Sequence, residues 1–102
     1  MIYLNRYYFL SMDIKDIIKE LNHICEDIYE LHNLLICNKL FKLHKYIKPH
    51  ISNELYMDYN KEIENVFFDS FISVEIGKNM NEIIYLISQI IIILNNIILN
   101  YP

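Results

Sequence analysis

The residues of this chain that could bind a metal ion are its four histidines and two cysteines. Zinc sites place such ligands at short spacings, so that several side chains reach one ion. Here Cys25 and His32 are seven residues apart, and so are Cys37 and His44. Seven residues are about two turns of a helix, which is too far for one ion to bridge. We therefore expect no metal site.

The same residue types could also support catalysis, but their pattern does not indicate it. Di-iron bundles use the Glu-x-x-His pattern twice, facing inward, whereas this chain has it once, at Glu20 and His23 on a polar face. A catalytic Cys–His pair needs a lowered thiol pKa and an oxyanion cradle, and no motif here supplies either. Cys25 lies on an apolar stripe and is expected to be a small core residue. We expect no enzymatic activity, no cofactor, and two reduced thiols, as in a cytoplasmic protein.

The composition limits the fold class. The chain has 102 residues, of which 54% are hydrophobic, and it contains one Gly and two Pro. One Gly excludes the glycine-rich loops that bind nucleotide phosphates and argues against a many-turned β-sandwich or barrel. The length fits a single domain. The abundance of Ile and Asn and the absence of Ala are typical of an AT-rich genome, so the Ile excess is not interpreted as a functional motif.

Helical periodicity predicts an all-α antiparallel bundle of three long helices and one short basic helix within one domain, 1–102. An apolar stripe with 3–4 spacing begins at Ile14, with Asp13 or Ser11 as its cap, and loses its phase near Asn38. Pro49 is expected to end the basic helix at Lys48, Ser52 to cap the next helix, and Gly77 to end it. Asn79, with Glu82 three residues later, predicts an Asn variant of the capping box at the start of the last helix. The predicted elements are an apolar N-terminal strap over 1–11 and helices over 13–37, 39–47, 53–76 and 80–100.

Segment 39–48 is the one basic stretch in a chain whose formal net charge is −4. Its lysines could contact phosphates, anionic lipid headgroups or an acidic partner. Alternatively, they could pair with Asp and Glu on neighbouring helices or with a dimer mate. We favour the second, structural interpretation, because exposed charge runs are ordinarily solvated faces. A stretch of four Lys without Arg in an acidic chain is a poor nucleic-acid footprint. The candidate contacts are Lys39, Lys42, Lys45 and Lys48.

The last helix is long and apolar enough to suggest a membrane span, since residues 83–102 carry no charge. Its amides, however, are not scattered. Ser88, Gln89, Asn95, Asn96 and Asn100 fall in one arc that only Ile92 and Leu99 interrupt, which favours an amphipathic helix packed against neighbours. Phe68 and Ile72 likewise lie off the main stripe of their own helix.

The apolar surface predicted from these helices is more than a small core would hide, which favours a partner surface. We expect a non-enzymatic protein–protein interaction module, a homo-oligomer or a subunit of a larger assembly, unless the N-terminal strap covers the surplus. The alternative is a membrane-associated protein, tail-anchored through 83–99 or surface-bound through 39–48. The expected partner-binding residues are Ile83, Ile87, Ile90, Ile91, Leu94, Ile97, Ile98, Leu34 and Leu35.

Overall fold

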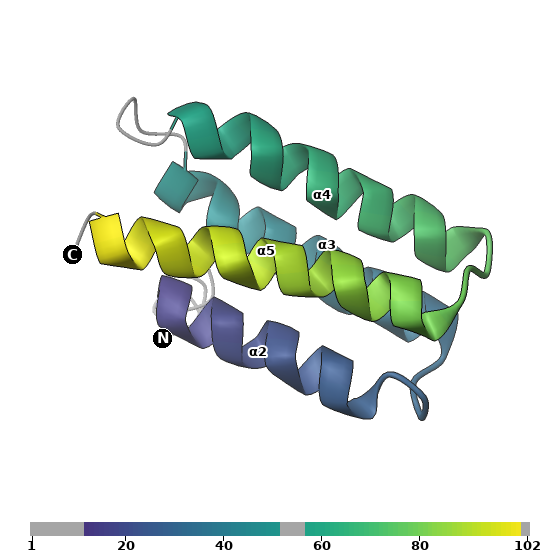
Figure 1. The fold of residues 1–102 in the computed structure, drawn as a ribbon. Helices are drawn as coiled ribbons and strands as arrows, with labels where there is room; N and C mark the ends of the chain where they lie inside the picture. Colours follow the sequence, from purple (N-terminus) through teal and green to yellow (C-terminus); the bar gives the residue numbers. More distant parts are fainter. Residues whose placement is uncertain (1–11, 52–56, 101–102) are drawn as a thin grey trace, which may run out of the picture.

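Four helices form a bundle in the computed structural model, which describes residues 12–51 and 57–100. Successive helices run in opposite directions (Figure 1). Helix α2 packs against α3 and α5, and α4 packs against the same two helices. The all-α class is therefore confirmed, while the predicted strap over 1–11 lies outside the described residues. The helices are α2 (Ile14–Asp27), α3 (Asn33–Ile51), α4 (Met57–Glu75) and α5 (Met80–Asn100).

The core lies along the bundle axis and is built almost entirely from Ile and Leu. Each helix contributes side chains at 3–4 spacing, which keeps them on the face toward its neighbours. Phe67 of α4 is the largest fully buried side chain. The buried apolar residues are Ile17, Leu21, Ile24, Ile28, Ile36, Leu40, Leu43, Ile47, Ile63, Phe67, Val74, Ile83, Ile87, Ile90, Ile93, Leu94 and Ile97.

The predicted continuous helix over 13–37 is wrong, because the chain turns between Asp27 and Asn33. A bond from the Glu30 amide to the Asp27 carbonyl closes the turn (2.9 Å), and the His32 carbonyl accepts the Ile36 amide (3.0 Å) at the start of α3. The turn resets the phase of the apolar stripe. Extending the stripe of α2 would place Lys39 in the core, whereas restarting the helix buries the stripe that begins at Ile36.

The separate short basic helix over 39–47 is also wrong, because those residues form the middle of the 19-residue helix α3. Pro49 lies inside the last turn of α3 and does not end the helix at Lys48. A proline inside a helix cannot donate an amide hydrogen bond and crowds the carbonyl four residues earlier, yet α3 continues through Pro49 to Ile51. The predicted cap at Ser52 lies outside the described residues.

The predicted link between the last two helices is confirmed at Gly77 and Asn79. Gly77 has a positive φ of 69°, and the bonds Gly77 N–H to Val74 O (3.2 Å) and Lys78 N–H to Ser73 O (2.9 Å) close the end of α4. This pair of bonds is the Schellman pattern that favours glycine. Asn79 Oδ1 then accepts the Asn81 amide (2.9 Å) and caps α5.

Two details of the predicted caps differ in the structure. Glu82 was expected to complete a capping box, but its carboxylate lies 3.7 Å from Lys78 Nζ on the exposed surface instead. Asp13 occupies the cap position of α2, yet its side chain makes no capping bond, and only its carbonyl accepts the Ile17 amide (3.0 Å). The caps thus fix the α4–α5 link more firmly than the start of α2.

Candidate interaction surface

The partner-binding residues predicted on the last helix separate into two groups in the structure. Five of them are fully buried within this single chain, so a partner could reach them only if the bundle opened. Ile91 and Ile98 are half-buried, and Leu34 and Leu35 at the start of α3 are exposed. The buried five are Ile83, Ile87, Ile90, Leu94 and Ile97.

The polar arc of α5 faces outward, as its spacing predicts. Two of its amides bind tyrosines of other helices or turns: Asn81 Oδ1 accepts from the Tyr29 hydroxyl (3.2 Å), and Asn100 Nδ2 donates to the Tyr59 hydroxyl (2.9 Å). By length and composition alone, α5 is the one described helix that could cross a membrane. In this structure its apolar face packs on the other helices instead.

Large apolar side chains are exposed on several elements, including Ile92 and Leu99 of α5, and four of them lie on the adjacent helices α3 and α4. Leu34 is 73% exposed, Phe41 52%, Phe68 62% and Ile72 40%. Below them, the half-buried Phe71 ring lies 6.1 Å from that of Phe41, centroid to centroid, and joins the two helices. We call Leu34, Phe41, Phe68 and Ile72 the α3–α4 patch. The off-stripe positions of Phe68 and Ile72 indicated this exposure from sequence.

A histidine sits beside the α3–α4 patch, in the seam between the helices. The His44 ring lies 5.1 Å from Phe67 and 6.3 Å from Phe71, with its edge toward the latter. Its Nε2 is 3.1 Å from Glu64 Oε1 but is not aligned with it as a hydrogen bond. This seam therefore holds α3 against α4 mainly by ring packing.

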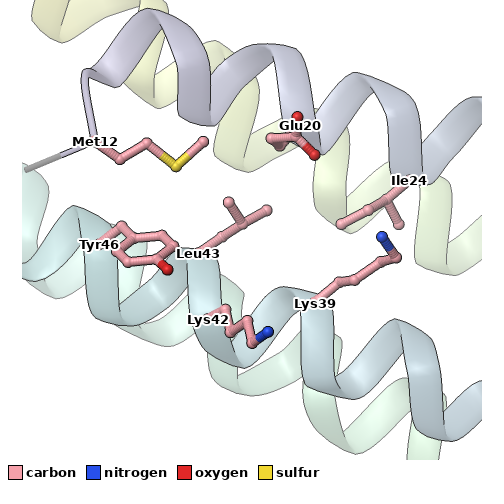
Figure 2. Close-up of a pocket in the computed structure, with 7 residues that line it drawn as sticks. All are labelled: Met12, Glu20, Ile24, Lys39, Lys42, Leu43 and Tyr46. Carbon is pink, nitrogen blue, oxygen red and sulfur yellow. The ribbon is translucent and has the colours of Figure 1, made fainter. Parts of the chain in front are cut away.

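The four lysines of the basic segment are spread around the exposed side of α3. Lys39 and Lys42 line a groove of about 330 Å³ between α2 and α3, where Figure 2 shows Glu20 and Ile24 facing them from α2. Lys45 lies next to Lys42 around the helix, and its ammonium is 4.8 Å from the centre of the Phe41 ring. Lys48 is exposed.

None of these lysines forms an ion pair within residues 12–51 and 57–100. The intrachain form of the favoured interpretation, in which the segment pairs with Asp and Glu of neighbouring helices, is therefore not observed there, and pairing with a dimer mate stays a prediction. Glu64 lies beside His44. The prediction that these lysines contact an external anion or an acidic partner stays a prediction.

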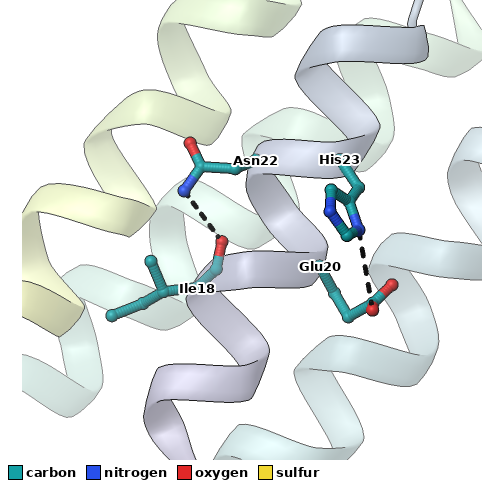
Figure 3. Close-up of polar contacts among 4 residues, drawn as sticks. All are labelled: Ile18, Glu20, Asn22 and His23. Atoms are coloured by element: carbon teal, nitrogen blue, oxygen red, sulfur yellow. Dashed lines mark hydrogen bonds and ion pairs between the residues drawn. The ribbon is translucent and has the colours of Figure 1, made fainter.

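The His, Cys, Asp and Glu side chains that could bind a metal ion are dispersed over the described helices. In the described part of the chain, no three His, Cys, Asp or Glu side chains are close enough to hold one metal ion. Glu20 and His23 face each other across 3.8 Å on the exposed side of α2 (Figure 3). At the other end of the bundle, His50 Nε2 donates to the Met12 carbonyl (2.6 Å) and ties the start of α2 to the end of α3.

Neither thiol has a lowered pKa. Burial raises the pKa of Cys25, and the nearby Glu26 carboxylate raises it further. Burial likewise raises the pKa of Cys37, with a smaller contribution from Glu75. A reactive cysteine needs the opposite shift, produced by a cation or a helix N-terminus. Cys25 packs against the core, as its place on the stripe indicates.

Comparison with protein-family models, with curated proteins and with solved structures gives no significant match to this chain.

Proposed function

We propose that this protein is a non-enzymatic helical interaction module that binds another protein, a second copy or a different subunit, through the α3–α4 patch. The observation that carries the proposal is the exposure of four large apolar side chains, between 40% and 73%, on two adjacent helices. Single exposed apolar residues are ordinary on protein surfaces. Clusters that include aromatic rings are typical of the centre of a protein interface.

The surroundings of the patch support a protein partner. The Lys45 ammonium lies 4.8 Å from the centre of the Phe41 ring and Glu75 is exposed three residues after Ile72, so charged groups accompany the apolar side chains, as in protein interfaces. The Phe41 and Phe71 rings are already packed together across the two helices, which reduces the conformational entropy that binding would cost. The underlying core contacts hold both helices in place, so the patch is presented on a rigid support.

Site-specific photo-crosslinking tests this function. A photoreactive phenylalanine analogue replaces Phe68 in the full chain, expressed in cells of its natural source, and adducts are identified by mass spectrometry. A matched variant carries the analogue at Asn22 on the exposed side of α2. We expect a protein adduct from position 68 and none from position 22. Absence of any protein adduct at position 68 would contradict the proposal.

The second candidate function is association with an anionic membrane surface through segment 39–48. The favouring observation is that Lys39, Lys42 and Lys48 have no ion-pair partner among the described residues, while Leu35 and Phe41 are exposed on the same helix. Basic and exposed apolar side chains together are typical of helices that lie on a membrane. Co-sedimentation with phosphatidylserine vesicles, lost in Lys39→Glu/Lys42→Glu, would support this function over the first.

The tail-anchored version has less support. Spanning a bilayer would require α5 to leave the bundle and withdraw the buried side chains Ile83, Ile87 and Ile90 from contacts with the other helices. Its exposed amides Asn95 and Asn96 would then lie in hydrocarbon, where an unpaired polar group costs several kcal/mol. Recovery of the protein only in detergent would favour the anchored form.

A further inference from the structure

We propose that the partner of the α3–α4 patch is a second copy of this chain, related by a two-fold axis that passes near the Phe41–Phe71 pair, so that Lys45 of each copy faces Glu75 of the other. This inference rests on the proposed function and specifies its partner.

The register of α3 against α4 is fixed by three contacts. Phe41 and Phe71 lie at one level, because their rings are 6.1 Å apart. Toward the C-terminal end of α3, His44 lies 3.1 Å from Glu64. Toward its N-terminal end, the Glu75 carboxylate lies near enough to Cys37 to raise the pKa of that thiol. The two helices therefore run antiparallel, with Phe41 and Phe71 at the same level.

This register places opposite charges symmetrically about the aromatic pair. Lys45 is four residues after Phe41, and Glu75 is four residues after Phe71. Four residues of helix rise about 6 Å, and the helices run in opposite directions, so the two charged residues lie about 12 Å apart along the bundle. Within one copy they are therefore on different helices and too far apart along the bundle axis to form an ion pair.

A two-fold axis perpendicular to this face brings Lys45 of one copy next to Glu75 of the other. Rotation by 180° exchanges the two ends and also exchanges the α3 side with the α4 side. Lys45 of one copy then lies over Glu75 of the other, and the same pair forms a second time, as an isologous interface requires. The rotation also places the exposed Phe41 of each copy over the exposed Ile72 of the other.

Both charged groups are available for this contact. Lys45 contacts the Phe41 ring but has no carboxylate within ion-pair distance among the described residues, and Glu75 has no cation there. A self-complementary patch with an apolar centre is what a homodimer needs, because one surface must supply both halves of the interface. Charge complementarity across the axis also fixes the orientation of the two copies.

A charge-exchange experiment tests the arrangement in the full chain. Sedimentation velocity over a concentration series at low salt measures the dimer dissociation constant for wild type, Lys45→Glu, Glu75→Lys and the double variant. We expect a wild-type dimer that each single variant weakens by about tenfold or more, because each creates like-charge contacts twice. The double variant should return to within about threefold of wild type.

The matched control exchanges the same charges elsewhere. Lys19→Glu/Glu26→Lys on the exposed side of α2 should leave the dissociation constant unchanged. Helical circular dichroism and melting temperature verify that each variant is folded. Rescue by the double variant cannot arise within one copy, because the two groups are too far apart there.

The outcomes separate this inference from the function on which it rests. A wild-type monomer at about 100 µM would overturn the two-fold arrangement. So would a dimer whose dissociation constant is the same in Lys45→Glu and Glu75→Lys as in wild type. If the analogue at position 68 then crosslinks to a different protein, the interaction module stands and the second copy is wrong. If position 68 gives no protein adduct, both proposals are wrong.

Discussion

Helices α5 and α3 use their apolar residues in different ways. The last helix is the most apolar element of the bundle; it buries six side chains, and Tyr85, Ile92 and Leu99 are exposed beside its amides. The less apolar helix α3 buries Ile36, Leu40, Leu43 and Ile47 and likewise leaves Leu34, Leu35 and Phe41 exposed. The comparison shows that total hydrophobicity does not predict how much apolar surface a helix exposes. The placement of apolar residues relative to the neighbouring helices does.

The physical reason is the width of the arc that each helix presents to its neighbours. In α5 the apolar arc is wide and mostly coincides with the arc that faces α2 and α4, while the amides share the exposed remainder with Tyr85, Ile92 and Leu99. In α3 the buried stripe is narrow, and the exposed residues lie outside it on both flanks. A helix with excess apolar residues in the correct arc is a core helix, whereas one with a few in the wrong arc is a candidate binding surface.

The largest effect should come from placing a charge in the buried arc of α5. Ile90→Asp buries an unpaired carboxylate at a fully buried position, and we expect a loss of stability of about 4 kcal/mol or more. Circular dichroism during urea unfolding should show the loss of a cooperative transition. Ile92→Asp, two residues away and 51% exposed, is the matched control and should remain folded. Equal effects at both positions would invalidate the assigned face.

Truncation on α3 should distinguish its buried stripe from its exposed flank. Leu40→Ala removes a fully buried side chain and should cost about 2–5 kcal/mol. Leu34→Ala, 73% exposed, should cost only about 0.5 kcal/mol or less. Urea unfolding measured by fluorescence of the tyrosines gives both values. A costly Leu34→Ala in the monomer would mean that the α3–α4 patch is part of the core.

A smaller effect is expected at the link that aligns α5 with α4. Gly77→Ala should destabilise the protein by about 1–2 kcal/mol, because an L-residue resists the positive φ of 69°. An added Cβ would meet no atom within 4 Å, so the cost comes from the backbone alone. Gly77→Asn should cost less, since Asn adopts the left-handed conformation more readily. If Gly77→Asn and Gly77→Ala lower the free energy of unfolding equally, the positive φ is not the cause of the loss.

The smallest effect concerns the thiol beside the α3–α4 patch. The raised pKa of Cys37 leaves less thiolate at any given pH, so its reaction with a disulfide reagent at pH 8 should be slower than that of free cysteine. Glu75→Gln removes the smaller of the two causes and should accelerate Cys37 modestly, without changing Cys25. A pH series of the reaction rates measures both shifts. An unchanged rate would place Glu75 farther from Cys37 than the structure does.

Much of the fold could be predicted from the sequence, because helical spacing and capping preferences agree with the packing of α4 and α5. The stripe of α4, the glycine stop at Gly77 and the cap at Asn79 all follow from residue types and spacing. The exposure of Phe68 and Ile72 followed from their position off the stripe. The turn between α2 and α3 could not be predicted from Gly or Pro, since it contains neither. Its only signal was the shift in phase between the stripe ending at Ile28 and the one starting at Ile36.

The sequence by itself determined which face of each helix is apolar, because 3–4 spacing projects side chains onto one side whatever the neighbours are. Only the tertiary structure decided what covers each face. It buried the Ile face of α5 within the chain and left the outer face of α3 and α4 uncovered. An apolar stripe predicts that one face of a helix is buried, but which part of the protein covers that face depends on where the chain turns. Here the turn at 28–32 determines which residues of α3 face the core.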